Sequence, residues 1–442
     1  MTETLEALRS GQLTGAKRLD LAADLTQFPL EILDLADSLE ILNLTNNRLH
    51  SLPNEFGRLQ KLKIAFFSNN HFQELPAVLS NCPNLSMVGF KANQIASIAD
   101  AALPTSVRWL ILTDNQIEQI PASWGRLGKL QKLMLAGNQL RSLPDEMAAC
   151  QNLELVRLSA NQLTSLPPWL LTLPRLSWLA YAGNPFCQAT RSPTPSLTEI
   201  DWADLVIQNT LGEGASGIIF KGEWVHSPTQ ATEVAIKVFK GEVTSDGLPA
   251  DEMRSYIAAG THPHLVKLLG KVVGHPEEKA GLVFAFVPPN YTTLGNPPSF
   301  DSCTRDTYSP DTAFSLPVIL QIAQGIAAAA AHLHSQGILH GDLYAHNILV
   351  NAMGESLLGD FGAASFYPET TPSIAPALES LEVRAFGCLL EDVLDRCILD
   401  NSANQVELRD RLRSLQHDCM DPFPSSRPSF AKICDFLAVP SN

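Results

Sequence analysis

Four polar residues in the second half of the chain have the types and the order that phosphoryl-transfer chemistry requires. Lys237 ends the apolar run Val234-Ala235-Ile236, and a lysine on such a strand must point its ammonium group at an anion. Asp342 is followed five residues later by Asn347, and Asp360 opens the sequence Asp-Phe-Gly. These positions put two carboxylates and an amide into a short stretch. Each supplies a different part of a phosphoryl-transfer site.

A glycine-rich segment, Gly212-x-Gly214-x-x-Gly217, ends 20 residues before that lysine and lies between apolar, strand-like runs. Glycines let the backbone approach phosphates closely, because a side chain would obstruct the contact. A dinucleotide-binding turn would be followed by a helix and then by an acidic residue on a strand. Here the run that follows, IIFKGEW (218–224), predicts a second strand. The segment is therefore expected to be a hairpin loop.

Together, these ordered motifs resemble those of eukaryotic-type protein kinases over residues 203–437. The resemblance implies a bilobal α+β kinase fold and the cofactors ATP and Mg²⁺ (or Mn²⁺). It assigns the ATP site to Gly212, Glu213, Gly214, Gly217, Ile219, Ala235, Lys237, Glu252 and Asp360.

The resemblance also gives the polar residues separate roles. The catalytic set is Asp342, which accepts the substrate hydroxyl proton, together with Lys237 and Asn347; Asn347 and Asp360 hold the metal. Lys237 contacts the α- and β-phosphates and pairs with a helix carboxylate, for which Glu252 is the match. Asp251 competes with it, because a slip of one residue in the alignment exchanges the two. ATP and two carboxylates cannot crowd together without a divalent cation.

Departures from the kinase pattern bear on specificity and on activity. Gly341 stands where many kinases have an arginine that contacts a phosphorylated activation loop, so we expect little dependence on loop phosphorylation. Residues 343–346, Leu-Tyr-Ala-His, match neither the Ser/Thr pattern nor the Tyr pattern, and hydroxyl specificity stays open. The sequences IDWADL (200–205) and RPSF (427–430) resemble the tyrosine-kinase-like group, whose members usually phosphorylate Ser/Thr. The alternatives are an inactive pseudokinase scaffold and a kinase of small molecules.

The first half of the chain contains an internal repeat. Asparagines recur at intervals of 22 or 23 residues, and apolar residues precede each one at −8, −5 and −3: Asn47, Asn70, Asn93, Asn115, Asn138, Asn161 and Asn184. The pattern resembles that of leucine-rich repeats, with a degenerate capping unit around Leu19-Asp-Leu21. It implies an α/β solenoid whose units bury their apolar residues only by stacking. We expect the asparagines to bond backbone groups of adjacent turns.

Strand alternation predicts which side chains line the concave sheet of this solenoid. They are unusually apolar, and an exposed apolar stripe marks an interaction site. The expected partner is a protein ligand, or the second half of this chain, bound at Ile64, Phe66, Met87, Trp109, Ile111, Met134, Leu155 and Trp178.

Length and composition bound the organisation of the chain. The 442 residues suggest two or three domains, which we place at residues 1–184 (repeats), 185–202 (a Pro/Ser linker) and 203–437 (kinase). The net charge is −15, and residues 1–190 carry 15 basic and 16 acidic residues, so the acidity belongs to the second half. Such a charge argues against nucleic acid or anionic lipid as the main partner. Scattered cysteines, and the absence of a signal-like or membrane-spanning stretch, predict a cytoplasmic protein.

Overall fold

The computed structural model describes residues 2–187, 197–214, 216–227, 229–241, 243–244, 246–368, 372–398 and 403–438. The chain divides into two compact units, Met1–Leu176 and Ser177–Asn442. The expected linker at 185–202 falls within the second unit, and its residues 188–196 lie outside the described ones. The last asparagine of the repeat, Asn184, also belongs to the second unit.

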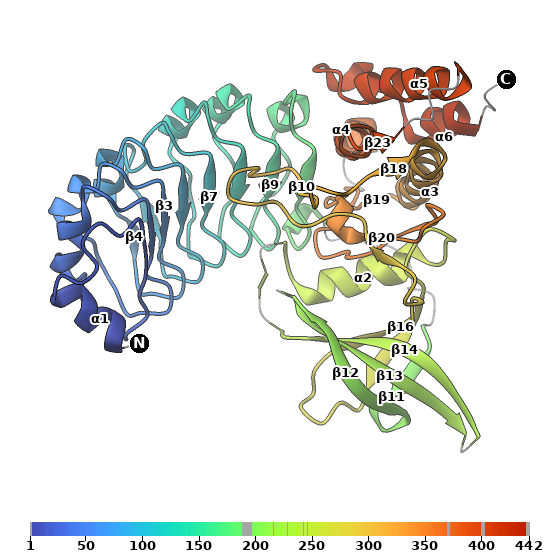
Figure 1. The fold of residues 1–442 in the computed structure, drawn as a ribbon, viewed down its shortest axis with the longest axis horizontal. Coiled ribbons are helices and arrows are strands. Elements are labelled where there is room, and N and C mark those ends of the chain that lie inside the picture. The colour runs from blue at the N-terminus through green and yellow to red at the C-terminus, as the bar shows by residue number, and fades with distance from the viewer. Residues whose placement is uncertain are drawn as a thin grey trace. The chain divides into compact units, whose positions relative to one another are not determined.

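The first unit is a solenoid of short parallel strands (Figure 1). Residues one repeat apart pair in register on neighbouring parallel strands: Ile41 pairs with Ile64, and Ile64 pairs with Met87. After helix α1 (Thr2–Arg9), the main strands follow in chain order: β1 (Arg18–Asp20), β2 (Ile41–Asn43), β3 (Ile64–Phe66), β5 (Met87–Gly89), β7 (Trp109–Ile111), β8 (Lys132–Met134) and β9 (Leu155–Arg157). The degenerate unit expected around Leu19 supplies β1, which pairs with β2.

Short 3-10 helices form the other side of most repeats, usually directly after the proline that ends the apolar pattern. They are η1 (Leu30–Leu35), η2 (Asn54–Arg58), η3 (Ala77–Asn81), η4 (Ala122–Arg126), η5 (Asp145–Ala149) and η6 (Pro168–Thr172). A small second sheet joins β4 (Glu74–Leu75) to β6 (Ser97–Ile98). Leucines from successive repeats fill the space between strands and 3-10 helices, which gives the continuous core that stacking predicts.

The asparagine ladder is confirmed. Asn138 is typical: its Nδ2 donates to the carbonyls of Leu112 (2.9 Å) and Leu135 (3.0 Å), and its Oδ1 accepts from the amide of Ile117 (3.1 Å). Such a side chain satisfies backbone groups of its own repeat and of the preceding one. The asparagines are therefore structural.

The concave residues are less accessible than expected. Five of the eight named positions are buried, with exposures of 2–8%: Ile64, Met87, Met134, Leu155 and Trp178. Neighbouring strands lie only about 4.8 Å apart, so large side chains one repeat apart cover each other. Trp178 is also covered by the stacked ring of Tyr344. The Trp109 Nε1–H, for example, lies 3.4 Å from the sulfur of Met134. The expected exposed stripe is wrong for the five buried residues, whereas Phe66, Trp109 and Ile111 are half-buried.

The second unit begins with β10 (Trp178–Ala180) and η7 (Pro185–Cys187) and continues into a six-stranded sheet. The strands of this sheet are β11 (Glu199–Asp201), β12 (Leu205–Glu213), β13 (Gly217–Ser227), β14 (Gln230–Phe239), β15 (Leu268–Val273) and β16 (Gly281–Ala285), in the spatial order β11-β15-β16-β14-β13-β12. One face packs as a core that includes Val234, Ile236 and Val238. Helix α2 (Pro249–Ala259) lies between this sheet and the remaining helices (Figure 1).

Helices dominate the rest of this unit. They are α3 (Leu316–Ser335), α4 (Ala375–Leu394), α5 (Ala403–Cys419) and α6 (Phe430–Ala438), with the short 3-10 helices η8 (Trp202–Asp204), η9 (Ala345–Asn347), η10 (Pro372–Ile374) and η11 (Pro424–Ser426). Small sheets join β17 (Thr292–Thr293), β20 (Ile348–Val350) and β21 (Ser356–Leu358), then β18 (Phe314–Ser315) and β23 (Cys397–Ile398), then β19 (Ile338–Leu339) and β22 (Ser365–Phe366).

Helix α3 is, among the described residues, the one helix long and apolar enough to cross a membrane by length and composition. Over half of its apolar window, 56%, is buried inside the fold. Its buried residues include Ile319, Ile322, Ile326 and Leu333, which recur at helical spacing. Core packing within the second unit accounts for this apolar face.

Candidate active site

Strand β14 positions Lys237 on the face of the sheet opposite the core. Val234, Ile236 and Val238 point into the core, so alternation places Ala235 and Lys237 on the other face. Ile219 is the antiparallel register partner of Lys237 and shares that face. The structure therefore brings three residues of the expected ATP site to one surface.

Helix α2 supplies the partner of this lysine. The Lys237 ammonium contacts the carboxylate of Glu252, and both side chains are buried, with exposures of 8% and 1%. Asp251, the competing candidate, instead contacts Arg254 one turn along the helix. Helix phase thus separates two adjacent carboxylates that spacing alone leaves equivalent.

Burial sets the protonation of Glu252. Removal from water raises its pKa, because the charged form loses hydration, and the nearby carboxylate of Asp360 acts in the same direction, so that the overall pKa is about 7. The Lys237 ammonium acts in the opposite direction. The ion pair with Lys237 is therefore coupled to pH near neutrality.

The glycine segment is a hairpin loop, as expected. Strands β12 and β13 are antiparallel, and the Gly214 amide donates to the Gly217 carbonyl at 2.9 Å. A Cβ at Gly217 would lie 2.5 Å from the Val238 carbonyl oxygen, so this glycine is needed for strand packing. Cβ atoms at Gly212 or Gly214 would meet nothing within 4 Å, which leaves open space beside the loop.

One more residue of the expected ATP site, Glu213, lies at the tip of this hairpin. Its carboxylate is 2.7 Å from the ammonium of Lys240, which also donates to the Gly214 carbonyl at 3.1 Å. The side chains of Lys240 and Glu213 are 37% and 60% exposed. The contact ties the loop to the end of β14.

The loop between β19 and β20 carries Asp342 and Asn347. The Asn347 Nδ2 donates to the Asp342 carboxylate at 2.7 Å and to its carbonyl at 3.0 Å. Asn347 lies at the end of η9, and its carbonyl accepts from the amide of Gly359 at 3.0 Å. This bond fixes Asn347 beside the strand end that leads to Asp360.

Glu382 on α4 binds the backbone of the same loop. Its carboxylate accepts from the backbone amides of Gly341 (2.8 Å) and His340 (3.2 Å) and lies 2.9 Å from the His334 ring. Burial alone would raise the pKa of Glu382, but the hydrogen bond from His334 and the backbone amide donors lower it overall. A carboxylate here holds the backbone that presents Asp342.

Asp360 is exposed and has a left-handed backbone, with φ of 51°. Its carboxylate accepts from the amide of Gly362 at 3.1 Å. The next residue, Phe361, is buried against the ring of Tyr256 on α2 (4.3 Å between centroids) and that of His340 (5.1 Å). This column of rings connects α2, which carries Glu252, to the loop that carries Asp342.

The residues present fit Mg²⁺-ATP. Asp360 and Asn347 offer a carboxylate and an amide oxygen, the hard ligands that Mg²⁺ prefers. Because Asn347 uses its Nδ2 on Asp342, its Oδ1 is the atom that would hold the cation. Lys237 would hold the phosphates below the open glycine loop. When bound, Mg²⁺-ATP supplies the phosphoryl group and neutralises the carboxylates.

Sequence reasoning missed Asp306, which lies between β17 and β18. Its carboxylate accepts from the amide of Ala345 (2.6 Å) and contacts the His346 ring (2.6 Å). Burial would lower the pKa of His346, but the hydrogen bond that its ring donates to Asp306 and the carboxylates of Asp342 and Asp360 raise it overall. Neighbouring Arg305 bonds to Glu391 and Asp392 on α4. No motif or spacing in the sequence marked these residues.

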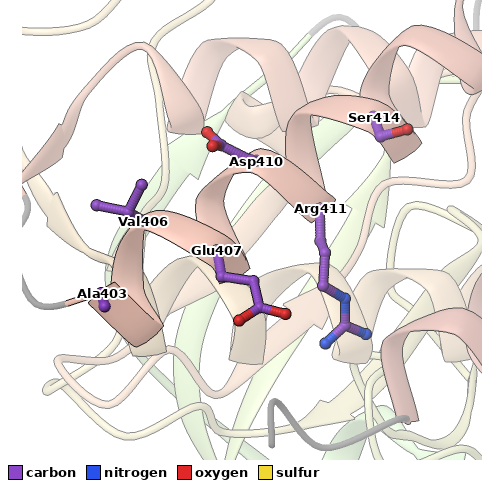
Figure 2. Close-up of a pocket in the computed structure, with 6 residues that line it drawn as sticks. All are labelled: Ala403, Val406, Glu407, Asp410, Arg411 and Ser414. Atoms are coloured by element: carbon purple, nitrogen blue, oxygen red, sulfur yellow. The ribbon is translucent and has the colours of Figure 1, made fainter.

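A separate surface depression lies along α5, where Figure 2 shows six side chains from successive turns of one helix. They are Ala403, Val406, Glu407, Asp410, Arg411 and Ser414. None of the expected site residues lines it, and its charged side chains are those of a solvated helix face. It plays no part in the site built above.

Family models match both halves of the chain. Residues 205–376 match the model of protein tyrosine and serine/threonine kinases. Residues 105–163 and 128–186 match a leucine-rich-repeat model, and residues 38–59 match a second one.

Curated proteins similar to this chain are kinases or carry receptor names. Fibroblast growth factor receptor 1 of Xenopus laevis is 25% identical over 293 residues, covering 54% of this chain and 35% of the relative. The receptor of the same name from Pleurodeles waltl is 24% identical over 322 residues, or 60% and 38% of the two chains. A probable cyclin-dependent kinase 10 of Dictyostelium discoideum is 30% identical over 185 residues, or 41% and 46%.

The chain thus spans less than half the length of each of these relatives. The segments matched by the repeat models contain asparagines of the ladder. The segment matched by the kinase model contains the hairpin loop and the expected site residues. This chain joins a series of leucine-rich repeats to a domain of the protein tyrosine and serine/threonine kinase family.

Proposed function

We propose that this chain is an active protein kinase that transfers the γ-phosphoryl group of ATP to serine or threonine hydroxyls of protein substrates. The observation that carries the proposal is the buried contact between Lys237 and Glu252. It joins β14 to α2 and holds the ammonium at the phosphate side of the sheet. Burying a charge pair is costly, because both groups lose hydration. We therefore take its presence as support for a functional role.

Each residue of the site then has a defined task. Lys237 orients the phosphates, and Glu252 orients Lys237. Asp342 accepts the proton of the substrate hydroxyl, while the hydrogen bond from Asn347 holds its carboxylate in position. Asp360 and Asn347 hold Mg²⁺. Positioning and electrostatic stabilisation account for most of the catalysis in this class of reaction.

The preference for serine and threonine rests on the tyrosine-kinase-like character of the segments 200–205 and 427–430. The matching family model covers both kinds of hydroxyl. Phosphoamino-acid analysis of the labelled product tests this part of the proposal, and phosphotyrosine as the main product would contradict it.

A catalytically silent scaffold is the alternative, and one observation favours it. Tyr344, two residues after Asp342, takes the position where serine/threonine kinases have a lysine, and its side chain is buried. The chain then lacks a cation that such kinases carry beside the catalytic aspartate.

Incubation of the purified full chain with γ-labelled ATP, Mg²⁺ and generic protein substrates tests activity. The variants are Asp342→Ala and Lys237→Met, and the control is Asp311→Ala, an exposed aspartate of the same unit. Loss of the base is expected to lower the rate by about 10²–10⁴-fold, with the control unchanged. Equal incorporation by the wild type and Asp342→Ala would support the scaffold instead.

We also propose that the repeats bind a protein partner through the half-buried Phe66, Trp109 and Ile111. These apolar side chains keep part of their surface exposed on β3 and β7, which both pair with β5. Trp109→Asp is expected to abolish capture of a partner without lowering the kinase rate on generic substrates. Unchanged capture would contradict this assignment.

A reducing, cytoplasmic location is proposed as well. All eight cysteines are free thiols, and burial raises the pKa of Cys82 and Cys150 to about 11, which makes them poor nucleophiles. Fractionation of cells that express the tagged full chain tests it, and recovery mainly outside the cytoplasm would contradict it.

A further inference from the structure

Strand β10, which ends the repeat pattern, contacts the loop between β19 and β20 directly. We call this loop, which carries Asp342 and Asn347, the catalytic loop. The Trp178 ring on β10 stacks on the Tyr344 ring, with centroids 4.3 Å apart and planes 8° from parallel. Its Nε1–H donates to the carbonyl of Leu343 at 3.1 Å. Trp178 and Tyr344 are both buried, at 2% and 4% exposure. All of these residues belong to the second compact unit.

The same strand also holds the segment that follows Asp360. Ser365 Oγ accepts from the backbone amides of Tyr181 (3.0 Å) and Ala182 (3.1 Å). Ser365 lies on β22, where its register partner is Leu339, the residue before His340. The β10 segment, residues 178–182, therefore touches both the catalytic loop and the start of the activation segment.

Gly341 makes this approach possible. Its φ is +73°, and a Cβ there would lie 2.5 Å from the Leu179 carbonyl oxygen and 2.7 Å from that of Ala363. Any side chain would push the β10 segment away and strain the backbone. The glycine that replaces the usual arginine is thus matched to a contact that no arginine could accommodate.

We infer that the β10 segment is a built-in positioning element of the kinase, with Trp178 as its principal positioning residue. In place of an arginine and a phosphorylated loop, the aromatic stack, the indole hydrogen bond and the Ser365 contacts hold the catalytic loop and activation segment together. Trp178 contacts the two residues that follow Asp342, so its loss moves the base relative to the substrate hydroxyl. This inference rests on the proposed kinase activity.

Steady-state kinetics of the full chain test the inference, with Trp178→Ala, Trp178→Phe and the control Trp169→Ala. Trp169 is a half-buried tryptophan of η6 in the first unit. Trp178→Ala is expected to lower kcat by about 10- to 100-fold, because small displacements of the base are costly. KM for ATP is expected to stay within about twofold, because Lys237 and the glycine loop lie on another sheet. Because loss of folded enzyme would also lower the apparent kcat at unchanged KM, each rate is divided by the concentration of folded chain, and hydrogen exchange gives a second readout.

Trp178→Phe keeps a smaller aromatic ring on Tyr344 and loses the hydrogen bond to Leu343. It is expected to recover kcat to within about fivefold of the wild type, the usual effect of one neutral hydrogen bond. The Trp169→Ala control is expected to retain the wild-type kcat. A kcat for folded Trp178→Ala that equals or exceeds the wild-type value would overturn the inference; an increase would make the β10 segment autoinhibitory instead.

Hydrogen exchange separates this inference from the proposed function. The amides of residues 343–347 are expected to exchange at least about tenfold faster in Trp178→Ala than in the wild type. If the wild type transfers no phosphate, the kinase proposal fails, and the exchange result alone decides whether the β10 segment orders the loop. Unchanged exchange would then overturn the inference.

Discussion

The contacts that stabilise each unit differ in how far apart in the sequence the bonded residues lie. In the repeats, Asn138 bonds to groups 21 and 26 residues away, about one repeat along the chain. In the second unit, Trp178 bonds to a carbonyl 165 residues away, and Tyr181 to a hydroxyl 184 residues away. Damage to the first unit should therefore remain local, whereas damage to the long contacts should reach the catalytic loop.

The largest effect is expected from Gly341→Arg, which restores the common kinase residue. Its Cβ would overlap two carbonyl oxygens at a positive φ, so we expect kcat to fall more than about 100-fold. The free energy of unfolding should fall by about 2–5 kcal/mol. Kinase assays and urea unfolding measure both.

Gly128→Arg is the matched control in the first unit, because a Cβ at this exposed glycine meets nothing within 4 Å. It is expected to change neither quantity. A Gly341→Arg protein with wild-type kcat would show that the close approach of Leu179 is not required, and the contrast in reach would lose its functional meaning.

The next effect concerns the ladder. Asn138→Ala leaves the amide of Ile117 and two carbonyls without their side-chain partner, which should cost the first unit about 2–4 kcal/mol of unfolding free energy. The kcat on generic substrates should not change. The neighbouring exposed Gln139→Ala serves as the control, and a parallel loss of kcat in Asn138→Ala would break the comparison.

A pH dependence follows from Glu252, whose folded pKa of about 7 lies above its ordinary value. Below pH 7 the carboxyl is protonated and the ion pair with Lys237 is lost, so kcat/KM for ATP should fall about tenfold between pH 8 and pH 6. The stability that this group contributes has the opposite trend. Because the fold binds the proton more tightly than the unfolded chain, that contribution is present at low pH and is lost as the pH rises through 7.

Glu252→Gln is the test of this assignment. It cannot titrate, so its low activity should show no step near pH 7. A Glu252→Gln profile that keeps the wild-type step would assign the titration to another group, such as His346.

The smallest effect is again local to the repeats. Ala160 precedes a ladder asparagine with φ of +53°, a conformation that disfavours side chains. Ala160→Gly should stabilise the first unit by about 0.5–1 kcal/mol after allowing for the entropy of glycine. Ala136→Gly, which has no positive φ, should destabilise the same unit, and thermal unfolding compares the two.

The sequence separation of these contacts also explains which structural features could be predicted from the sequence. A period of 22 or 23 residues is visible in a single sequence, so the strands, the asparagine bonds and the β1 capping unit followed from it. The hairpin loop was predictable because strand-like residues follow Gly217. Ordered motifs placed Lys237, Asp342, Asn347 and Asp360 in one site without any need to know their distances.

Other features required coordinates. Glu252 and Asp251 are adjacent, and only the phase of α2 decides which one meets Lys237. The exposed stripe failed because alternation predicts the direction of a side chain and not what covers it. Asp306 and Trp178 meet the catalytic loop across 39 and 165 residues, and no period or motif records such pairings.

The most direct test of the account is a double-mutant cycle between Trp178 and Tyr344, read as kcat of the full chain. If the stack on Tyr344 is how the β10 segment positions the loop, Trp178→Ala adds little to the damage of Tyr344→Ala. The double variant should then have nearly the kcat of the worse single variant. Penalties that multiply would show that the two rings act independently and would contradict the account.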